Sequence, residues 1–554
     1  MKDLIVSILR AAIARAQADG KLSAAASTAT IVVEEPKDPA HGDAASNLAL
    51  AMARAEGKPP RALAQTIRDA MELPPEIAEA TIAGPGFLNF RMAPEYWRRE
   101  LKRVAAEGPG YVSPKFGGGR TVQVEFLSAN PTGPLTVGHG RNAVLGDTLA
   151  RIFAATGHRV TREYYFNDGG RQMKLLGESV RVRYLEELGR VASMPEDGYQ
   201  GEYIRDIARG LKERHGAALA EGADPEVFVK AAVAAIFSEI NQTCAKLGIS
   251  FDVYTNELDL MRDGRVDAVM AALRERDLVI ERDGAQWLAG EKLGLPKDQV
   301  LIRSTGEPTY RTPDIAYHID KLKRGFDLVV DVFGADHIAE HVGVIAALKA
   351  LGYDTSPIRA IIYQFVTLTR GGEKIKMSTR KATYITLDEL IDEVGADVVR
   401  FFFLLRKHDS HLDFDLDLAR RQAPENPVFY VQYAHARLAS VFREAERAGF
   451  NLPDNLDGVD LTALGPEEID LARRAAAFPE VVAGAVADLE PHRIPFFLLE
   501  LAGEFHRYYN KPANRIINPD DRPLSIARLV LARALKNGFA GGLGLLGVNA
   551  PDRM

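Results

Sequence analysis

Residues 120–166 place the narrowest limit on the fold of this chain. An apolar run, TVQVEFL, is followed by a helical pattern over about 140–156 that ends at Gly157, and then by a second strand-like run, HRVTREYYF. Further apolar runs at 328–333 and 360–368 do not alternate with polar residues, which is typical of parallel strands covered by helices on both faces. The pattern predicts a doubly wound α/β fold around a parallel sheet.

The length of 554 residues requires more than one hydrophobic core. Residues 1–112 mix helical patterns with short strand-like pieces and run into the linker-like EGPGYVSPKFGGG, which predicts a small α/β domain. The doubly wound domain then covers 113–420, and the polar helical stretch near 194–247 is too long for a simple crossover, so it predicts an inserted helical subdomain. From 421 to 554 strand signals are absent, and we expect an all-helical C-terminal domain.

Cysteine content, hydropathy and charge exclude several classes of protein. The single cysteine, Cys244, cannot form an internal disulfide, which fits a reducing compartment. No apolar run approaches the roughly 20 residues that span a bilayer, so we expect a cytoplasmic protein without a membrane partner. The net charge of −7 restricts any nucleic-acid surface to a local basic face. Basic residues exceed acidic ones toward the C-terminus, which fits such a face but also fits a solvated helix surface.

The segment ANPTGPLTVGH, residues 129–139, follows a strand and opens a helix. Pro131 stiffens the turn, Gly138 allows close approach of a planar ligand, and His139 lies where a helix N-terminus favours an anion. Ligands of parallel sheets bind at the carboxyl ends of the strands, so the segment predicts a nucleotide-phosphate site. Taken alone, it also fits a Pro-Gly turn with a capping histidine.

A second segment, GGEKIKMSTRK (371–381), follows the strand-like AIIYQFVTLT. Its basic side chains and Ser378 are of the types that neutralise a triphosphate and the pyrophosphate that leaves it. Taken alone, the segment also fits a solvated charged turn.

In this order, about 240 residues apart, the two segments resemble the HIGH and KMSKS signatures of class I aminoacyl-tRNA synthetases. Bacterial-type arginyl-tRNA synthetases are similar over nearly the full length, for example in VEFLSANPTGPLTVGHGRNAVLGD, TYRTPDIAYHIDKL and KMSTRKATYITLDELIDEVGADVVRFFFL. The resemblance implies a Rossmann-like class I catalytic domain at 113–420. It also implies an additional tRNA-contacting domain at 1–112 and an anticodon-binding domain at 421–554.

The resemblance further implies a ligase that activates L-arginine with Mg–ATP to arginyl-adenylate and transfers arginine to the 3′ end of tRNA(Arg). We expect ATP with Mg²⁺ as substrate, no tightly bound cofactor, no protein-bound metal and a monomer. The attacking carboxylate is already ionised, so positioning and charge stabilisation carry the first step. Two alternatives remain open: a non-catalytic tRNA-binding paralogue and a related nucleotidyltransferase.

Site residues follow from the same resemblance, position by position. Catalysis is expected from His139, Thr136, Lys376 and Ser378. ATP binding is expected from Pro131, Gly138, His139, Asp336, His337, Lys374, Lys376, Met377, Ser378 and Arg380. Arginine binding is expected from Glu125, Asn130, His139, Tyr310 and Asp314, because a planar guanidinium pairs bidentately with carboxylates.

Several of these residues also fit purely structural roles. Glu125 fits a strand-end ion pair, Asp314 a helix N-cap, and Tyr310 a core position. Asp336 and His337 fit a loop cap.

Two positions depart from the signatures. Thr136 stands where the first histidine of HIGH would fall, and Thr379 replaces the second lysine of KMSKS. Some arginyl enzymes carry a compensating lysine just before the first signature, but Gly133 occupies that position here. We therefore expect the cationic role to pass to another basic residue of the second segment: Lys374, Lys376, Arg380 or Lys381.

Overall fold

The computed structural model describes residues 1–36, 38–375 and 385–554. The chain divides into two units, each of which is built from three segments. The first unit comprises Met1–Gly108, Val441–Ala477 and Arg507–Leu535, and the second comprises Pro109–Ser440, Phe478–His506 and Lys536–Met554. The helices of the C-terminal segment are thus shared between the units.

The first unit contains a four-stranded antiparallel sheet of order β1-β2-β4-β3. Its strands are β1 (Val33–Glu34), β2 (Ala44–Ser46), β3 (Ile77–Ala83) and β4 (Phe87–Met92). Helices α1 (Lys2–Ala18), α2 (Leu48–Glu56) and α3 (Pro60–Asp69) bury one apolar face each, with Leu9, Leu48 and Leu63 fully enclosed. Helix α4 (Pro94–Glu107) follows, and it packs with α17 (Pro466–Ala476).

The second unit is built on five parallel strands in the order β12-β11-β5-β6-β7. They are β5 (Thr121–Glu125), β6 (Arg159–Phe166), β7 (Val253–Asn256), β11 (Leu328–Gly334) and β12 (Ile358–Tyr363). The chain starts in the middle at β5, proceeds to β7 on one side, and later adds β11 and β12 on the other. The direction of winding therefore reverses between β5 and β11, which is where doubly wound sheets bind their ligands. The predicted fold class is confirmed.

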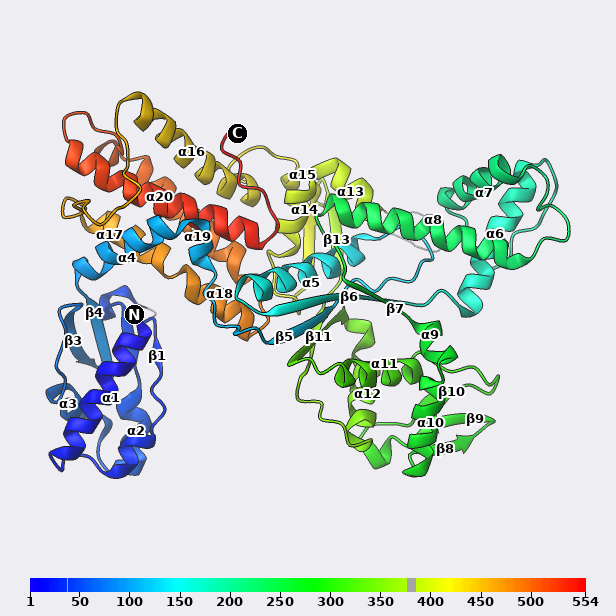
Figure 1. Ribbon diagram of the computed structural model, residues 1–554, viewed down its shortest axis with the longest axis horizontal. Coiled ribbons are helices and arrows are strands. Elements are labelled where there is room, and N and C mark those ends of the chain that lie inside the picture. The colour runs from blue at the N-terminus through cyan, green and yellow to red at the C-terminus, as the bar shows by residue number, and fades with distance from the viewer. Residues whose placement is uncertain (37, 376–384) are drawn as a thin grey trace. The chain divides into compact units, whose positions relative to one another are not determined.

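Helices cover both faces of this sheet. Figure 1 shows α5 (Val137–Ala155) on one face and α11 (Arg311–Lys323) with α12 (Ile338–Ala350) on the other. Helix α5 comes so close to the sheet that a Cβ atom at Gly146 would lie 2.2 Å from Phe126. Because side chains alternate along a strand, Glu125 points to the opposite face from Phe126, toward α11.

The remaining elements of the second unit extend this sheet. Between β6 and β7 lie α6 (Gly170–Glu187), α7 (Glu202–His215) and α8 (Pro225–Lys246), and α6 packs against both of the others. Helices α9 (Glu257–Arg262) and α10 (Arg265–Glu275) precede an antiparallel sheet of β8 (Val279–Arg282), β9 (Ala285–Leu288) and β10 (Gln299–Ile302). A third sheet holds β13 (Val366–Arg370), β14 (Glu373–Lys374) and β15 (Leu412–Asp415). Helices α13 (Leu387–Val394), α14 (Ala396–Phe403) and α15 (Leu416–Ala419) complete this region.

Residues 421–554 are all described and contain helices without a strand. The helices are α16 (Pro427–Arg447), α17, α18 (Phe478–Ala487), α19 (Arg493–Tyr509) and α20 (Arg522–Leu545). The all-helical C-terminal segment agrees with the prediction.

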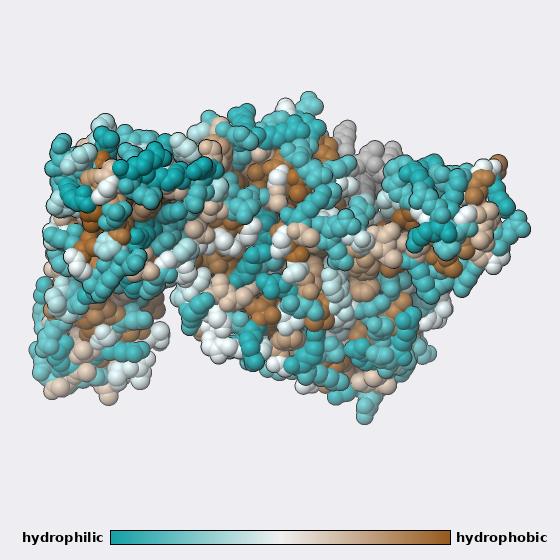
Figure 2. All heavy atoms as spheres, turned by 45° about the horizontal axis from the view of Figure 1, so that its top comes forward, coloured by the Kyte–Doolittle hydropathy of each residue, from teal (hydrophilic) through white to brown (hydrophobic). Residues whose placement is uncertain are grey.

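The face shown in Figure 2 is mainly hydrophilic, with hydrophobic residues in scattered patches. Across the described part of the chain, no helix is both long and apolar enough to span a bilayer.

Candidate active site

Three acidic side chains lie in one row across the central sheet. Asp331 of β11 is in register with Glu125 of β5, and Glu125 is in register with Glu163 of β6. Residues in register on neighbouring parallel strands point to the same face, so all three carboxylates face α11. Three carboxylates this close would repel one another without counter-charges.

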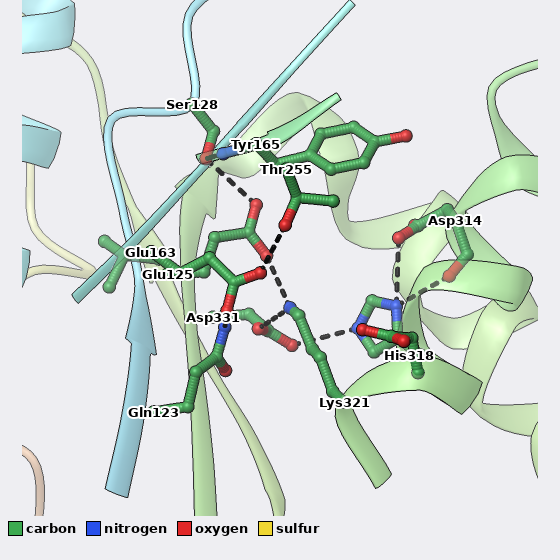
Figure 3. Close-up of polar contacts among 12 residues, drawn as sticks. Gln123, Glu125, Ser128, Glu163, Tyr165, Thr255, Asp314, His318, Lys321 and Asp331 are labelled. Carbon is green, nitrogen blue, oxygen red and sulfur yellow. Dashed lines mark hydrogen bonds and ion pairs between the residues drawn. The ribbon is translucent and has the colours of Figure 1, made fainter. Parts of the chain in front are cut away.

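Helix α11 and the residue that follows it supply these counter-charges. The Nζ atom of Lys321 lies 2.5 Å from Glu125 Oε2 and 2.6 Å from Asp331 Oδ1. Figure 3 shows Lys321 between these two carboxylates. Arg324 donates to both oxygens of Glu163, at 2.8 and 3.1 Å. Burial disfavours the charged forms, but Lys321 and His318 outweigh it for Asp331 and hold the pKa of that carboxyl far below its ordinary value. Asp331 is therefore ionised.

His318 lies between two carboxylates. Its Nδ1 atom is 2.9 Å from Asp314 Oδ1, and its Nε2 atom is 3.0 Å from Asp331 Oδ2. Burial opposes protonation of the ring, but Asp314 and Asp331 outweigh it and raise the pKa of His318 to about 10. His318 is thus a second cation in this cluster.

The same histidine also belongs to a group that resembles a metal site by geometry. Ligand atoms of His318, Asp331 and His341 lie within 4.8 Å of one another. A metal needs a neutral imidazole, whereas both ring nitrogens of His318 face carboxylates and Lys321 donates to Asp331. The chemistry of the group is that of an ion-pair network.

Exposure separates the carboxylates that a ligand can reach from those that it cannot. The side chain of Asp314 is 34% exposed and that of Glu125 is 16% exposed. Asp331 is only 4% exposed, and Lys321 is fully enclosed. A ligand at this end of the sheet can therefore reach Glu125 and Asp314, while Lys321 and Asp331 lie behind them.

A sharp backbone turn after β5 holds Glu125. Leu127 and Ser128 have φ values of 68° and 43°, which are unfavourable for residues other than glycine. The hydroxyl of Ser128 donates to Glu125 Oε1 at 2.9 Å and accepts from the backbone N–H of Tyr165 at 3.2 Å. Since Lys321 binds the other oxygen, both oxygens of Glu125 are fixed.

The other residues predicted to bind arginine occupy the surroundings of this cluster. The side-chain oxygen of Asn130 accepts from the backbone N–H of Asn167 at 3.0 Å. Tyr310 is the N-cap residue of α11, and because it is 47% exposed it is not a core residue.

The N-cap alternative for Asp314 is wrong, since Asp314 lies inside the first turn of α11. The ion-pair alternative for Glu125 is correct, since Glu125 forms an ion pair with Lys321.

The predicted phosphate site forms the N-terminus of α5. Thr136 is the N-cap, and its Oγ1 accepts from the backbone N–H of His139, while His139 Nδ1 accepts from the backbone N–H of Thr136 at 3.1 Å. The capping role considered for His139 is therefore present. Burial lowers the pKa of His139 to about 4, so the ring is neutral and carries its proton on Nε2.

The chain just after the second signature lies against the first. Thr136 forms an isolated antiparallel bridge with Thr386, and the N–H of Leu387 donates to the carbonyl of Leu135 at 2.8 Å. At Gly140 a Cβ atom would lie 2.5 Å from Leu387 Cδ1, so a glycine there permits this close packing. Lys374 is exposed on β14. The following predicted residues lie outside the described ones: Lys376, Met377, Ser378, Thr379, Arg380 and Lys381.

The remaining predicted ATP ligands lie around this point. Pro131 is buried, and Gly138 is in the first turn of α5. Tyr203 of α7 donates to the carbonyl of Thr132 at 2.7 Å, and a Cβ atom at Gly133 would lie 3.0 Å from its hydroxyl. A compensating lysine at 133 would therefore require the Tyr203 hydroxyl to shift by a few tenths of an ångström.

Asp336 and His337 follow β11 directly and are 62% and 57% exposed. His337 Nδ1 bonds to Glu340 Oε2 at 3.0 Å, and this contact raises the pKa of the ring. The two residues lie at the carboxyl end of β11.

The sequence interpretation missed the inner half of the cluster: His318, Lys321, Asp331, Glu163 and Arg324. A signal was present, because Asp314, His318 and Lys321 have the spacing i, i+4, i+7 of one helix face. Asp331 also interrupts the apolar run LVVDVF. A carboxylate in a buried strand predicts a buried cation opposite it.

Glu257 was also missed, and it is 4% exposed. It accepts from the hydroxyl of Tyr165 at 2.9 Å and from the side chain of Asn167 at 2.6 Å. Burial raises the pKa of Glu257 to about 7.

We expect the stability of α5 to report the protonation of His139. Because its pKa is about 4 in the folded chain and 6.5 without burial, its contribution to the free energy of unfolding is complete above pH 6.5 and is lost as the pH falls toward 4. His139→Gln keeps a capping-box side chain that does not titrate. Urea unfolding of both proteins between pH 4 and pH 8 should show the wild type losing more stability below pH 6.5. Parallel curves would contradict a neutral, partly buried His139.

Comparison with known proteins gives a consistent assignment along the chain. Residues 3–92 match the family model described as arginyl tRNA synthetase N terminal domain, residues 102–402 match tRNA synthetases class I (R), catalytic domain, and residues 431–554 match DALR anticodon binding domain. An arginine–tRNA ligase of Desulfotalea psychrophila is 49% identical over 524 residues, which is 94% of each chain. One of Salinibacter ruber is 47% identical over 543 residues, covering 95% of this chain and 96% of its own.

Solved structures show the same fold. The arginyl-tRNA synthetase of Thermus thermophilus has a TM-score of 0.74 at 25% identity, and the comparison covers 99% of both chains. The enzyme from Plasmodium falciparum has a TM-score of 0.75 at 17% identity over 100% of this chain and 99% of its own. At that identity the likeness concerns the fold alone.

Proposed function

The chain belongs to the arginyl-tRNA synthetases, and from this premise we propose that Glu125 and Asp314 receive the guanidinium of L-arginine while the N-terminus of α5 receives ATP. The observation that carries the proposal is the pair of reachable carboxylates beside the reversal of the sheet, held by Lys321 and His318. A guanidinium presents five N–H donors in one plane and pairs with such carboxylates, whereas the ammonium of lysine does not match this geometry. Asn130 and Tyr310 would orient the rest of the amino acid.

The first step joins arginine to AMP. A carboxylate oxygen of arginine attacks the α-phosphorus of ATP, the bond from that phosphorus to the bridging oxygen breaks, and pyrophosphate leaves with Mg²⁺, which enters as part of the Mg–ATP substrate. Neutral His139 would donate its Nε2–H to a phosphate oxygen, and the amides of α5 would add their dipole. Lys374 and the basic residues of 376–381 would neutralise the leaving group.

The second step transfers arginine to tRNA(Arg). A terminal ribose hydroxyl attacks the carbonyl carbon of the adenylate, the bond from that carbon to the phosphate oxygen breaks, and AMP leaves as the hydroxyl proton passes to its phosphate or to water. The match of residues 431–554 to an anticodon-binding domain supports a role for the C-terminal helices in reading the anticodon. Residues 1–112 would contact the tRNA as well. The proposal includes a cytoplasmic monomer that binds tRNA(Arg), L-arginine and ATP.

Arginine-dependent exchange of pyrophosphate into ATP tests the proposal, with and without tRNA(Arg) and with lysine as competitor. We expect exchange with arginine that lysine does not inhibit, because a site that hydrogen-bonds its substrate rejects analogues by about 10⁴-fold or more. Exchange that appears only with tRNA would add a coupling between the two substrates. Binding of tRNA without any exchange would instead support the non-catalytic paralogue.

A further inference from the structure

The cluster around α11 does not balance its charges. It contains three carboxylates, Glu125, Asp314 and Asp331, and two cations, Lys321 and His318, so three negative and two positive charges leave a net charge of −1. The neighbouring pair of Glu163 and Arg324 is neutral by itself. Because Glu125 and Asp314 are only partly exposed, this net charge is less well solvated than in water, and a partner of opposite sign is favoured.

We infer that Lys321 and His318 are positioning residues that set the specificity of the site formed by Glu125 and Asp314. With these two cations the cluster keeps one uncompensated negative charge, which a ligand side chain with a single positive charge balances. This inference rests on the proposed placement of arginine at Glu125 and Asp314. It adds a charge-based discrimination against citrulline, which has nearly the shape of arginine but no charge and fewer N–H donors.

Lys321 acts through the carboxylates and not on the ligand. Its side chain is fully enclosed, and its ammonium bonds to Glu125 and Asp331, with the ring of Tyr317 4.2 Å away. Figure 3 shows the ammonium between these two carboxylates and His318 between Asp331 and Asp314. Lys321 therefore separates two carboxylates that the sheet register brings side by side.

Loss of Lys321 would leave Glu125 and Asp331 to share a proton. Burial already raises the pKa of Glu125, and the ammonium of Lys321 opposes that rise. The other ionisable groups that face the cluster would remain: Asp314, His318, Glu163, Arg324, His341 and Glu257. A protonated Glu125 is a poor partner for a guanidinium, so arginine would have to displace the proton.

The test compares Lys321→Met with Lys323→Met, which removes an exposed lysine from the same helix. The double variant Lys321→Met/Asp331→Asn restores the net charge of −1 without restoring the ammonium. In the exchange assay we expect Lys321→Met to raise the KM for arginine at least about tenfold, more at pH 6 than at pH 8, with little change in the KM for ATP. Lys323→Met should match the wild type, and the double variant should recover most of the loss.

An unchanged KM for arginine in Lys321→Met would overturn the inference, as would a double variant that folds but stays as impaired as the single one. Glu125→Gln separates this failure from failure of the proposed site. If Glu125→Gln keeps the wild-type KM, the placement of arginine is wrong and the inference falls with it. If Glu125→Gln is impaired and Lys321→Met is not, only the inference falls.

The wild-type protein supplies a measurement that does not depend on folding of the variants. Calorimetric titration with arginine at pH 8, in buffers of different ionisation enthalpy, counts the protons exchanged on binding. A pocket that is one charge short should exchange fewer than about 0.3 protons per site. Release of about one proton would show that a proton already supplies the missing charge, which contradicts the inference.

Discussion

Replacement of Asp314 by asparagine is expected to lower kcat/KM for arginine at least about 100-fold, because truncation of one partner of a desolvated charge pair costs about 2–5 kcal/mol. The substitution keeps the shape of the side chain and removes its charge. It also removes one of the two carboxylates that keep His318 protonated. Steady-state pyrophosphate exchange at varied arginine and at varied ATP measures the effect.

Asp267→Asn is the matched control, since Asp267 is an exposed aspartate on α10, the helix that packs beside α11. We expect wild-type kinetics for the control and a KM for ATP that neither substitution changes greatly. If Asp314→Asn lowers kcat/KM for arginine and kcat/KM for ATP by the same factor, Asp314 has a general structural role.

Replacement of Arg400 by methionine is expected to lower the free energy of unfolding by about 3–5 kcal/mol, since it removes a buried cation from Asp147 and leaves two buried carbonyls without their donor. Asp147 would keep the partly exposed Arg151 at 2.6 Å and Arg162 at 3.7 Å. The guanidinium of Arg400 is 1% exposed and lies 2.6 Å from Asp147 Oδ2. It also donates to the carbonyls of Leu546 and Leu247, at 2.6 and 2.9 Å. It thereby joins α14 to α5, to the end of α8 and to the C-terminal turn. Urea unfolding followed by circular dichroism measures the loss.

Arg181→Met gives the comparison for a solvent-exposed arginine. Arg181 pairs with Glu178 on α6 at 3.0 Å, and both side chains are 41% exposed. Such pairs contribute about 0–1 kcal/mol. If Arg400→Met and Arg181→Met lose the same free energy of unfolding, the buried contacts of Arg400 do not stabilise the fold as we expect.

The sequence was a good guide to the doubly wound sheet, because β11 and β12 are largely apolar runs that do not alternate with polar residues, and a parallel sheet has few alternatives. It also indicated the start of α5, although the helix begins at Val137, earlier than the helical pattern suggested. The reason is the capping box of Thr136 and His139, of which the sequence analysis had considered only the capping histidine. The division of the C-terminal helices between two units depends on distant packing and leaves no local pattern.

The candidate site was predictable only on its outer side. Glu125 and Asp314 were indicated by the chemistry of a guanidinium and by the resemblance to a family. The sequence did not indicate their neighbours Lys321 and Asp331, because Lys321 contacts Glu125 across 196 positions of the chain. Strand register decides that Glu125 and Asp331 lie side by side, and register cannot be read from the separate strands.

A crystal structure with a non-hydrolysable arginyl-adenylate analogue tests the central claim most directly. We expect the guanidinium nitrogens to lie within hydrogen-bonding distance of Glu125 and Asp314, with Lys321 still bonded to Glu125 and the adenylate phosphate at the N-terminus of α5. A guanidinium seated elsewhere, or a Lys321 that leaves Glu125 when the ligand binds, would contradict it.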